Sequence, residues 1–459
     1  MQNCLVTASW SKTPKYPKMT GIYVSLYFVT ILFLISFVLE FPGKSMANAL
    51  YAQSGGVTAV INASALGVIE TVRAHPQHFG RIYAAINGIS GLLREDLMDI
   101  AAEDPDEIPK LRYTPGGAFG SCRHKLKPDN AQELHRILGV FKAHDIRYFF
   151  YNGGGDSQDT THKIAQFCQQ QAYSVQCIGI PKTIDNDLPI TDNSPGFGSV
   201  AKYVAVSARE ASLDVASMCD SSTKVFIMEV MGRHAGWIAA AAGIIKQHPE
   251  DSPHIILLPE RPFLQEQFLA KVQATVAQCG FCVVIVAEGL RDAQGNHLHT
   301  ARRQDDFGHA QLGGVAMAIA GLVEQKLGLK YHWAVLDYLQ RSARHLASQV
   351  DVDQAYAVGK AAVAYAIQGE NAILPVIRRI SDNPYQWNIG KAPLAEVANQ
   401  EKILPEHFIA ADGFGITQAA RDYFLPLIQG EAYPPYVQGL PVFARLKKVS
   451  VPKKCPVSC

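Results

Sequence analysis

Short apolar runs alternate with amphipathic stretches along most of the chain, and this alternation predicts strands and helices in turn. The runs 254–258 and 281–286 are typical of strands buried on both faces of a parallel sheet. Apolar positions at helical spacing predict helices at 131–143 and 200–218. The pattern therefore favours an α/β fold. Further strands are predicted at 50–53, 83–86, 146–151, 175–180, 225–230 and 372–378, and further helices at 57–72, 162–170 and 351–368.

Two polar turns directly follow the predicted strands 146–151 and 175–180. The first, Gly153–Ser157, reads GGGDS, and its glycines allow the backbone to approach an anion closely. A helix beginning just beyond would supply free N–H groups and a positive dipole end. The second turn, Lys182–Asp187, reads KTIDND. One lysine to hold phosphate and one carboxylate to accept a proton are the minimum needed for phosphoryl transfer to a hydroxyl.

Together these two turns resemble the phosphofructokinase family. Members that use ATP carry GGDGS at the first turn and a glycine before Thr-Ile-Asp, whereas this chain has Asp156 and Lys182 at the altered positions. Both replacements are typical of the pyrophosphate-using branch. An aspartate would occupy the space that an α-phosphate needs and would repel its negative charge. A lysine suits a small, highly charged donor. Pro115, where the ATP enzymes have an arginine before paired glycines, also points away from ATP.

The resemblance implies a fold and a reaction. The expected fold is α/β, with two similar three-layer α/β/α lobes and the active site in the cleft between them. The expected reaction is reversible phosphoryl transfer from diphosphate to the 1-hydroxyl of fructose 6-phosphate, giving fructose 1,6-bisphosphate and phosphate in glycolysis and gluconeogenesis. Mg²⁺ would neutralise the diphosphate. A cytoplasmic homo-oligomer, either dimer or tetramer, is expected.

The resemblance also implies roles for individual residues. Asp185 would be the general base, and Lys182 would stabilise charge on the phosphoryl group in flight. Asp156 would take part in catalysis and hold the metal, because Gly155 stands where the ATP enzymes have their aspartate ligand. The diphosphate would be bound by Gly56, Gly154 and Lys182. The sugar phosphate would be bound by Thr183, Ile184, Asp185, Lys224 (from a neighbouring subunit), Met231, Gly232, Arg233, Glu288, Tyr338 (where the ATP enzymes have histidine) and Arg341.

Composition limits the alternatives. Lys and Arg number 42 against 41 Asp and Glu, so nothing suggests a nucleic-acid surface, and anion binding must be local. The nine cysteines are scattered, which suits reduced thiols. Cys279 and Cys282 have redox-motif spacing but lie at an apolar run, which favours buried strand cysteines. The basic tail 447–454 is expected to be a frayed terminus.

The first 45 residues differ from the rest. The segment 19–39 carries no charge and is long enough to span a bilayer, and three lysines precede it. That arrangement would send the remainder outward, which does not suit an enzyme of sugar phosphates. Met46 begins a segment that resembles the family's start, so we expect a start codon assigned too far upstream, no membrane association, and a catalytic domain over 46–459. A membrane-anchored form is the alternative.

Two other functions are alternatives. One is an ATP-dependent 6-phosphofructokinase, which Asp156, Lys182 and Pro115 disfavour. The other is a catalytically silent subunit that senses sugar phosphate beside an active homologue. It predicts the loss of Asp185 or Lys182, and both are present.

Overall fold

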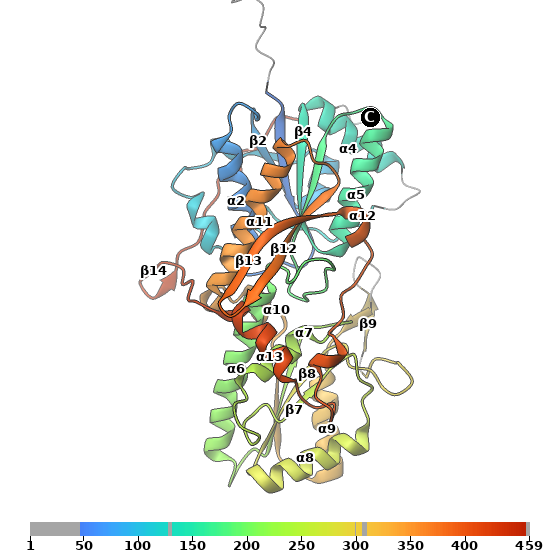
Figure 1. The fold of residues 1–459 in the computed structure, drawn as a ribbon, viewed down its shortest axis with the longest axis vertical. Helices are drawn as coiled ribbons and strands as arrows, with labels where there is room; N and C mark the ends of the chain where they lie inside the picture. Colours follow the sequence, from blue (N-terminus) through green and yellow to red (C-terminus); the bar gives the residue numbers. More distant parts are fainter. Residues whose placement is uncertain (1–45, 127–130, 299, 305–309, 456–459) are drawn as a thin grey trace, which may run out of the picture. The chain divides into compact units, whose positions relative to one another are not determined.

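The structure is a computed structural model that describes residues 46–126, 131–298, 300–304 and 310–455. Two sheets organise it (Figure 1). The larger has seven strands in the order β13-β12-β5-β4-β1-β2-β3, of which β12, β5, β4, β1 and β2 run parallel. The smaller is parallel, in the order β11-β6-β8-β7. The strands are β1 (Asn48–Gln53), β2 (Ile82–Ala85), β3 (Leu97–Asp99), β4 (Ile146–Gly153), β5 (Gln176–Pro181), β6 (Val225–Val230), β7 (Ile255–Leu257), β8 (Cys282–Ala287), β11 (Tyr331–Val335), β12 (Ile373–Asp382) and β13 (Tyr385–Pro393).

Helices cover both faces of the seven-stranded sheet. Successive side chains of a strand point to opposite faces, so Ala49 and Tyr51 of β1 belong to one core and Leu50 and Ala52 to the other. The first core is completed by α2 (Ile61–Ala74) and α11 (Gln349–Ile367), and the second by α4 (Ala131–Ala143) and α5 (Gly155–Gln170). This lobe therefore has three layers.

The four-stranded sheet is covered in the same way. Met228 and Val230 of β6 pack with α6 (Phe197–Met218) and α7 (Trp237–Ala241), while Val225 and Ile227 face α8 (Gln265–Cys279) and α9 (Val315–Leu327). The prediction of two three-layer α/β lobes is confirmed. The two lobes are similar in the order of their layers but differ in the size of the sheet, because one sheet has seven strands and the other has four.

The chain passes between the lobes more than once. After the second lobe it returns through α11 to the first, where β12 and β13 extend the larger sheet. It then reaches the second-lobe core again, where Phe408 and Phe424 pack against Trp237. The C-terminal segment thus ties the two lobes together. The remaining helices and strands are α3 (Gly88–Arg94), α10 (Asp337–Ser342), α12 (Leu394–Val397), α13 (Gln418–Phe424), β9 (Thr300–Gln304), β10 (Ala310–Leu312), β14 (Tyr436–Val437) and β15 (Leu440–Pro441), with short 3-10 helices at 100–102, 109–113, 242–245, 344–346, 406–408 and 425–428.

Most predicted elements are confirmed within a few residues, but two predictions are wrong. Cys282 is buried in β8 as expected, whereas Cys279 ends α8 and is half-buried. The basic tail is not frayed, because the backbone N–H groups of Lys447 and Lys448 donate to Glu103. Cys122, Cys168, Cys177, Cys219, Cys279 and Cys282 are free thiols, as predicted.

The apolar segment 19–39 lies outside the described residues. Within the described ranges, no helix combines the length and the apolar character needed to cross a membrane.

Candidate functional site: a cationic pocket beside buried carboxylates

The turn after β1 forms the floor of a pocket. Gly55 has a φ of +72°, a left-handed conformation that glycine adopts without strain. A Cβ at Gly55 would lie 3.4 Å from Nζ of Lys182, and one at Gly56 would lie 3.0 Å from Nη1 of Arg341. The bare backbone therefore lets two cationic groups come directly onto the turn.

The pocket above this turn has a volume of about 650 Å³. Basic groups dominate it, since Arg123 and Arg341 line it and Nζ of Lys182 donates to the carbonyl oxygen of Gly56 at 2.5 Å. Three basic side chains from distant parts of the chain thus converge, which suits a small polyanion. The lining residues are Gly55, Gly56, Val57, Ser90, Ser121, Cys122, Arg123, His124 and Arg341.

The pKa of Lys182 is unusually low for a lysine. Its side chain is buried, and burial together with the positive charge of Arg341 lowers its pKa from 10.5 to about 7. A bound anion would reverse both effects, because it would replace lost hydration and oppose the neighbouring charge. The electrostatic surroundings of Lys182 therefore suit an anionic ligand.

The first turn of α5 borders the same region. Gly154 is the N-cap residue, and no side chain caps the helix there. A Cβ at Gly155 would have no heavy atom within 4 Å, so open space lies in front of the helix N-terminus. Asp156 stands in the first turn, not at the cap, and its carboxylate pairs with Nζ of Lys125 at 2.8 Å. Free N–H groups and open space at a helix N-terminus suit an anionic ligand.

Asp185 lies on the loop that follows β5. Burial raises the pKa of its carboxyl from 3.8 to about 7, and the negative charges of Asp187 and Glu288 act in the same direction. Its backbone N–H donates to the hydroxyl of Thr183 at 3.1 Å. A buried carboxyl whose pKa lies near neutral pH is suited to accept a proton from a hydroxyl.

The second lobe supplies a carboxylate and a guanidinium at the carboxyl ends of β6 and β8. Glu288 donates its backbone N–H to the carbonyl of Val230 at 2.9 Å, which joins the two strand ends. Gly232, in the adjoining turn, has a φ of +141°, which an L side chain rarely adopts. Burial raises the pKa of Glu288, while the positive charge of Arg233 opposes that rise. Because Glu288 also acts on Asp185, the two lobes contribute to one site.

Two residues expected to bind the sugar phosphate, Arg341 and Lys224, do not lie where a site formed within one chain would need them. Arg341, expected on the sugar phosphate, lies over Gly56 in the cationic pocket and stacks on the ring of Tyr338 at 3.8 Å. Lys224 precedes β6, at the opposite end of the strand from Met231. Within one chain Lys224 does not join Arg233.

Three residues of the site were not assigned by sequence reasoning. Arg123 and Lys125 follow the glycine-containing stretch 113–122, but only the tertiary structure places them at the pocket and at Asp156. Asp187 is buried with a raised pKa, and its Oδ1 atom has no hydrogen-bond partner among the described residues. The sequence does contain a sign of this second carboxylate, because Asp187 follows Asp185 by two positions.

Comparisons with known proteins identify the family of the chain. Residues 48–366 match the family model described as phosphofructokinase. The chain is 58% identical over 411 residues to the pyrophosphate–fructose 6-phosphate 1-phosphotransferase of Halomonas elongata, covering 89% of this chain and 98% of that protein. It is 59% identical over 413 residues to the protein of the same name from Xanthomonas campestris, with 89% and 98% covered. The crystal structure of a pyrophosphate-dependent phosphofructokinase from Marinobacter aquaeolei matches with a TM-score of 0.83 and 56% identity, covering 89% and 98% of the two chains.

Proposed function

This chain belongs to the phosphofructokinase family, and we propose that it transfers phosphate reversibly between pyrophosphate and the 1-hydroxyl of fructose 6-phosphate. The products in the forward direction are fructose 1,6-bisphosphate and phosphate. The observation that carries the proposal is the buried Lys182 between the turn of Gly56 and the loop of Asp185, with Arg123 and Arg341 beside it. That arrangement offers concentrated positive charge for a small donor.

In the proposed reaction, Asp185 accepts the proton of the sugar's 1-hydroxyl as the oxygen attacks the terminal phosphorus of the diphosphate. The raised pKa of Asp185 keeps its basicity close to what proton transfer near neutral pH requires. The bridging P–O bond breaks, and the leaving phosphate departs with the electron pair. Lys182 and the N-terminus of α5, with Gly154 at its cap, stabilise the negative charge that spreads over the phosphoryl oxygens.

The sugar phosphate is assigned to the facing ends of the second-lobe strands. Arg233 and the turn formed by Met231 and Gly232 would hold the 6-phosphate, and Glu288 would accept hydrogen bonds from sugar hydroxyls. Thr183 and Ile184 would border the reacting end from the first lobe. Tyr338 and Arg341 would close the site between the two phosphates, since Arg341 already lies at the diphosphate pocket.

The residues present fit Mg²⁺ in one particular way. The described part of the chain brings no three histidine, cysteine, aspartate or glutamate side chains together as a metal site. A magnesium ion that keeps several waters and binds through one carboxylate plus substrate phosphates needs no such group. Asp156, beside the open space at Gly155, supplies that carboxylate. When bound with the diphosphate, the ion neutralises part of the donor's charge.

Donor choice is assigned to the same two residues that differ from the ATP-using pattern. Asp156 puts a carboxylate beside the α5 N-terminus, where a longer polyphosphate would extend, and Lys182 concentrates charge on a small donor. The test is turnover of fructose 6-phosphate by the purified full chain with Mg²⁺, using pyrophosphate or ATP in parallel reactions. Turnover with pyrophosphate alone supports the proposal. Turnover with ATP alone would contradict the assigned roles of Asp156 and Lys182.

We further propose that the enzyme is a homo-oligomer, a dimer or tetramer, in the cytoplasm, where sugar phosphates and pyrophosphate are made and consumed. β6 separates Lys224 from Met231, and six residues at 3.3 Å each span about 20 Å. Lys224 therefore serves a sugar phosphate only in the site of another copy. Nearby, Trp333 and Val335 of the edge strand β11 are exposed, as an interface would require.

Mixed oligomers test this shared site. Lys224→Ala and Asp185→Asn variants are each expected to be inactive, or nearly so, when pure. Refolding or co-expressing them together should restore activity, because hybrid oligomers contain sites in which both Lys224 and Asp185 are intact. If the mixture is no more active than its components, Lys224 does not act across an interface.

A further inference from the structure

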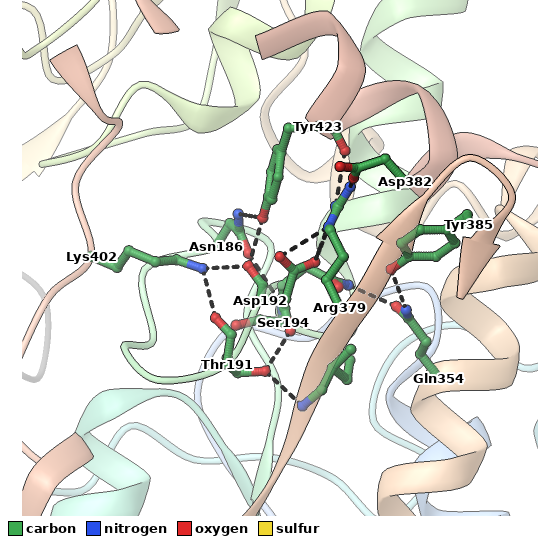
Figure 2. A network of polar contacts seen from close by, with 12 residues as sticks. Asn186, Thr191, Asp192, Ser194, Gln354, Arg379, Asp382, Tyr385, Lys402 and Tyr423 are labelled. Atoms are coloured by element: carbon green, nitrogen blue, oxygen red, sulfur yellow. Dashed lines mark hydrogen bonds and ion pairs between the residues drawn. The ribbon is translucent and has the colours of Figure 1, made fainter. Parts of the chain in front are cut away.

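The C-terminal part of the chain, beyond the family match that ends at residue 366, reaches back to the loop that carries Asp185. Arg379 of β12, Lys402 and Tyr423 of α13 gather around that loop (Figure 2). Tyr423 contacts Asn186, which lies between Asp185 and Asp187, while Arg379 and Lys402 contact the loop further along. Residues outside the matched region therefore contact the loop that carries Asp185.

Asn186 is a buried residue in a left-handed turn. Its φ is +53°, in the left-handed region that asparagine adopts more readily than other residues with a side chain, and its side chain is fully buried. The amide oxygen accepts a hydrogen bond from the N–H of Ser194 at 3.0 Å, and the amide nitrogen donates to the hydroxyl of Tyr423 at 3.1 Å. These two contacts orient the side chain and, through it, the backbone on either side.

Tyr423 is itself held firmly. Its hydroxyl donates to the carbonyl oxygen of Asp192 at 2.6 Å, and its ring lies under the guanidinium of Arg379 at 4.5 Å. Arg379 in turn pairs with the carboxylate of Asp192, with Nε at 3.0 Å from Oδ2 and 3.1 Å from Oδ1. Burial raises the pKa of Tyr423, so its hydroxyl stays protonated and continues to donate at physiological pH.

Lys402 supports the same loop from a second direction. Its backbone N–H donates to the carbonyl of Asp187 at 2.7 Å, and its ammonium group donates to the carbonyls of Thr191 and Asp192 at 3.1 and 2.7 Å. Lys402 therefore fixes the part of the loop that follows Asn186. Deleting the hydroxyl of Tyr423 removes its hydrogen bonds with both Asn186 and Asp192 and leaves those of Lys402 in place.

We propose that Tyr423 is a positioning residue for the general base, acting through Asn186 to hold Asp185 in its buried, reactive orientation. The inference rests on the proposed function, because it takes Asp185 as the base. It adds a role that lies outside the matched family region.

The position of Asp185 determines the pH dependence of the reaction. The charged groups that act on Asp185 are Asp187 and Glu288, which raise its pKa, and Lys182, which lowers it, while burial is the largest cause of the rise. A loosened loop would admit water beside Asp185 and weaken the effect of burial. The pKa of Asp185 would then fall from about 7 toward its ordinary value.

The experiment compares Tyr423→Phe with Tyr385→Phe in the full chain. Both rings stack on Arg379, at 4.5 and 4.9 Å, but the Tyr385 hydroxyl accepts from Gln354 at 3.0 Å, whereas the side-chain amide of Asn186 donates to Tyr423. Tyr423→Phe is expected to lower kcat by about 10- to 100-fold, as a misplaced catalytic group does. The KM for fructose 6-phosphate should change little, and the acid limb of the kcat profile should move to lower pH. Tyr385→Phe should retain the wild-type profile.

The inference is overturned if Tyr423→Phe keeps the wild-type kcat and pH profile. It is also overturned if kcat falls with the pH midpoint unchanged, because a smaller folded fraction produces that result, or if both variants behave alike.

A measurement without turnover separates this inference from the proposed function. Infrared difference spectra between each protein and its Asp185→Asn counterpart follow the carboxyl of Asp185 directly. The midpoint should lie near pH 7 in the wild-type background and lower in the Tyr423→Phe background, whereas equal midpoints would contradict the role of Tyr423. Absence of wild-type turnover with pyrophosphate would refute the proposed function, and this titration would still decide the question of Tyr423.

Discussion

Replacing Asp185 by asparagine should remove activity and, above neutral pH, stabilise the fold. The side chain keeps its size, but the carboxyl that accepts the proton and that is hard to ionise in its buried position is lost. Loss of a general base costs about 10²- to 10⁴-fold in rate. Binding of fructose 6-phosphate should persist, because Arg233 and the other groups assigned to the sugar phosphate are untouched.

The expected stabilisation follows from the raised pKa of Asp185. In the unfolded chain the carboxyl ionises near pH 3.8, and in the folded protein near pH 7. As pH rises between these values, ionisation increasingly favours the unfolded state. The difference, at 1.36 kcal/mol per pH unit, corresponds to about 4 kcal/mol above pH 7 and to about 1.5 kcal/mol at pH 5. These are upper values, because Asp187 titrates beside Asp185.

The assay is urea denaturation of wild type and Asp185→Asn at pH 5 and pH 8. The variant's advantage in free energy of unfolding should grow by at most about 2.5 kcal/mol between the two pH values. Asp156→Asn is the matched control. Its carboxylate is partly exposed and pairs with Lys125, so this variant should gain no stability at pH 8. An Asp185→Asn protein that is no more stable than wild type at pH 8, or that retains more than a small fraction of its activity, would refute the reasoning.

Two further variants test other parts of the structure. Asp156→Gly combined with Lys182→Gly should make ATP detectable as a donor, because it removes the carboxylate and the lysine assigned to donor choice; if nucleotide use stays undetectable in kinetic assays, other groups determine the donor. Glu95→Gln should destabilise the fold by about 2 kcal/mol, because the buried carboxylate accepts the N–H groups of Lys454 and Cys455 and contacts His144. Denaturation measures the latter effect, and an unchanged free energy of unfolding would show that the tail is not held by Glu95.

The sequence predicted the features that depend on neighbouring residues. Strands β4 and β5, the turn at Gly153–Ser157 and the loop at Lys182–Asp187 are all short-range patterns, and each lies where it was expected. The pocket's place at the turn of Gly56 followed from the resemblance. These features could be predicted because strand, turn and helix start are encoded within a few residues of each other.

The features that were missed depend on contacts between distant residues. Asn186 and Tyr423 are 237 positions apart, and Arg341 reaches the turn at Gly56 from the other lobe. The tail was expected to fray because its acceptors, Glu95 and Glu103, lie more than 300 residues earlier. Neither composition nor periodicity carries information about such pairs.

The reverse reaction, followed by ³¹P NMR, tests the proposed phosphate donor most directly. The purified enzyme is incubated with fructose 1,6-bisphosphate, orthophosphate and Mg²⁺, without nucleotide. We expect a pyrophosphate resonance to appear as fructose 6-phosphate forms, because the pocket of Lys182, Arg123 and Arg341 binds phosphate as the acceptor. If no pyrophosphate forms, while added ADP is converted to ATP, the pocket serves a nucleotide and pyrophosphate is not the donor.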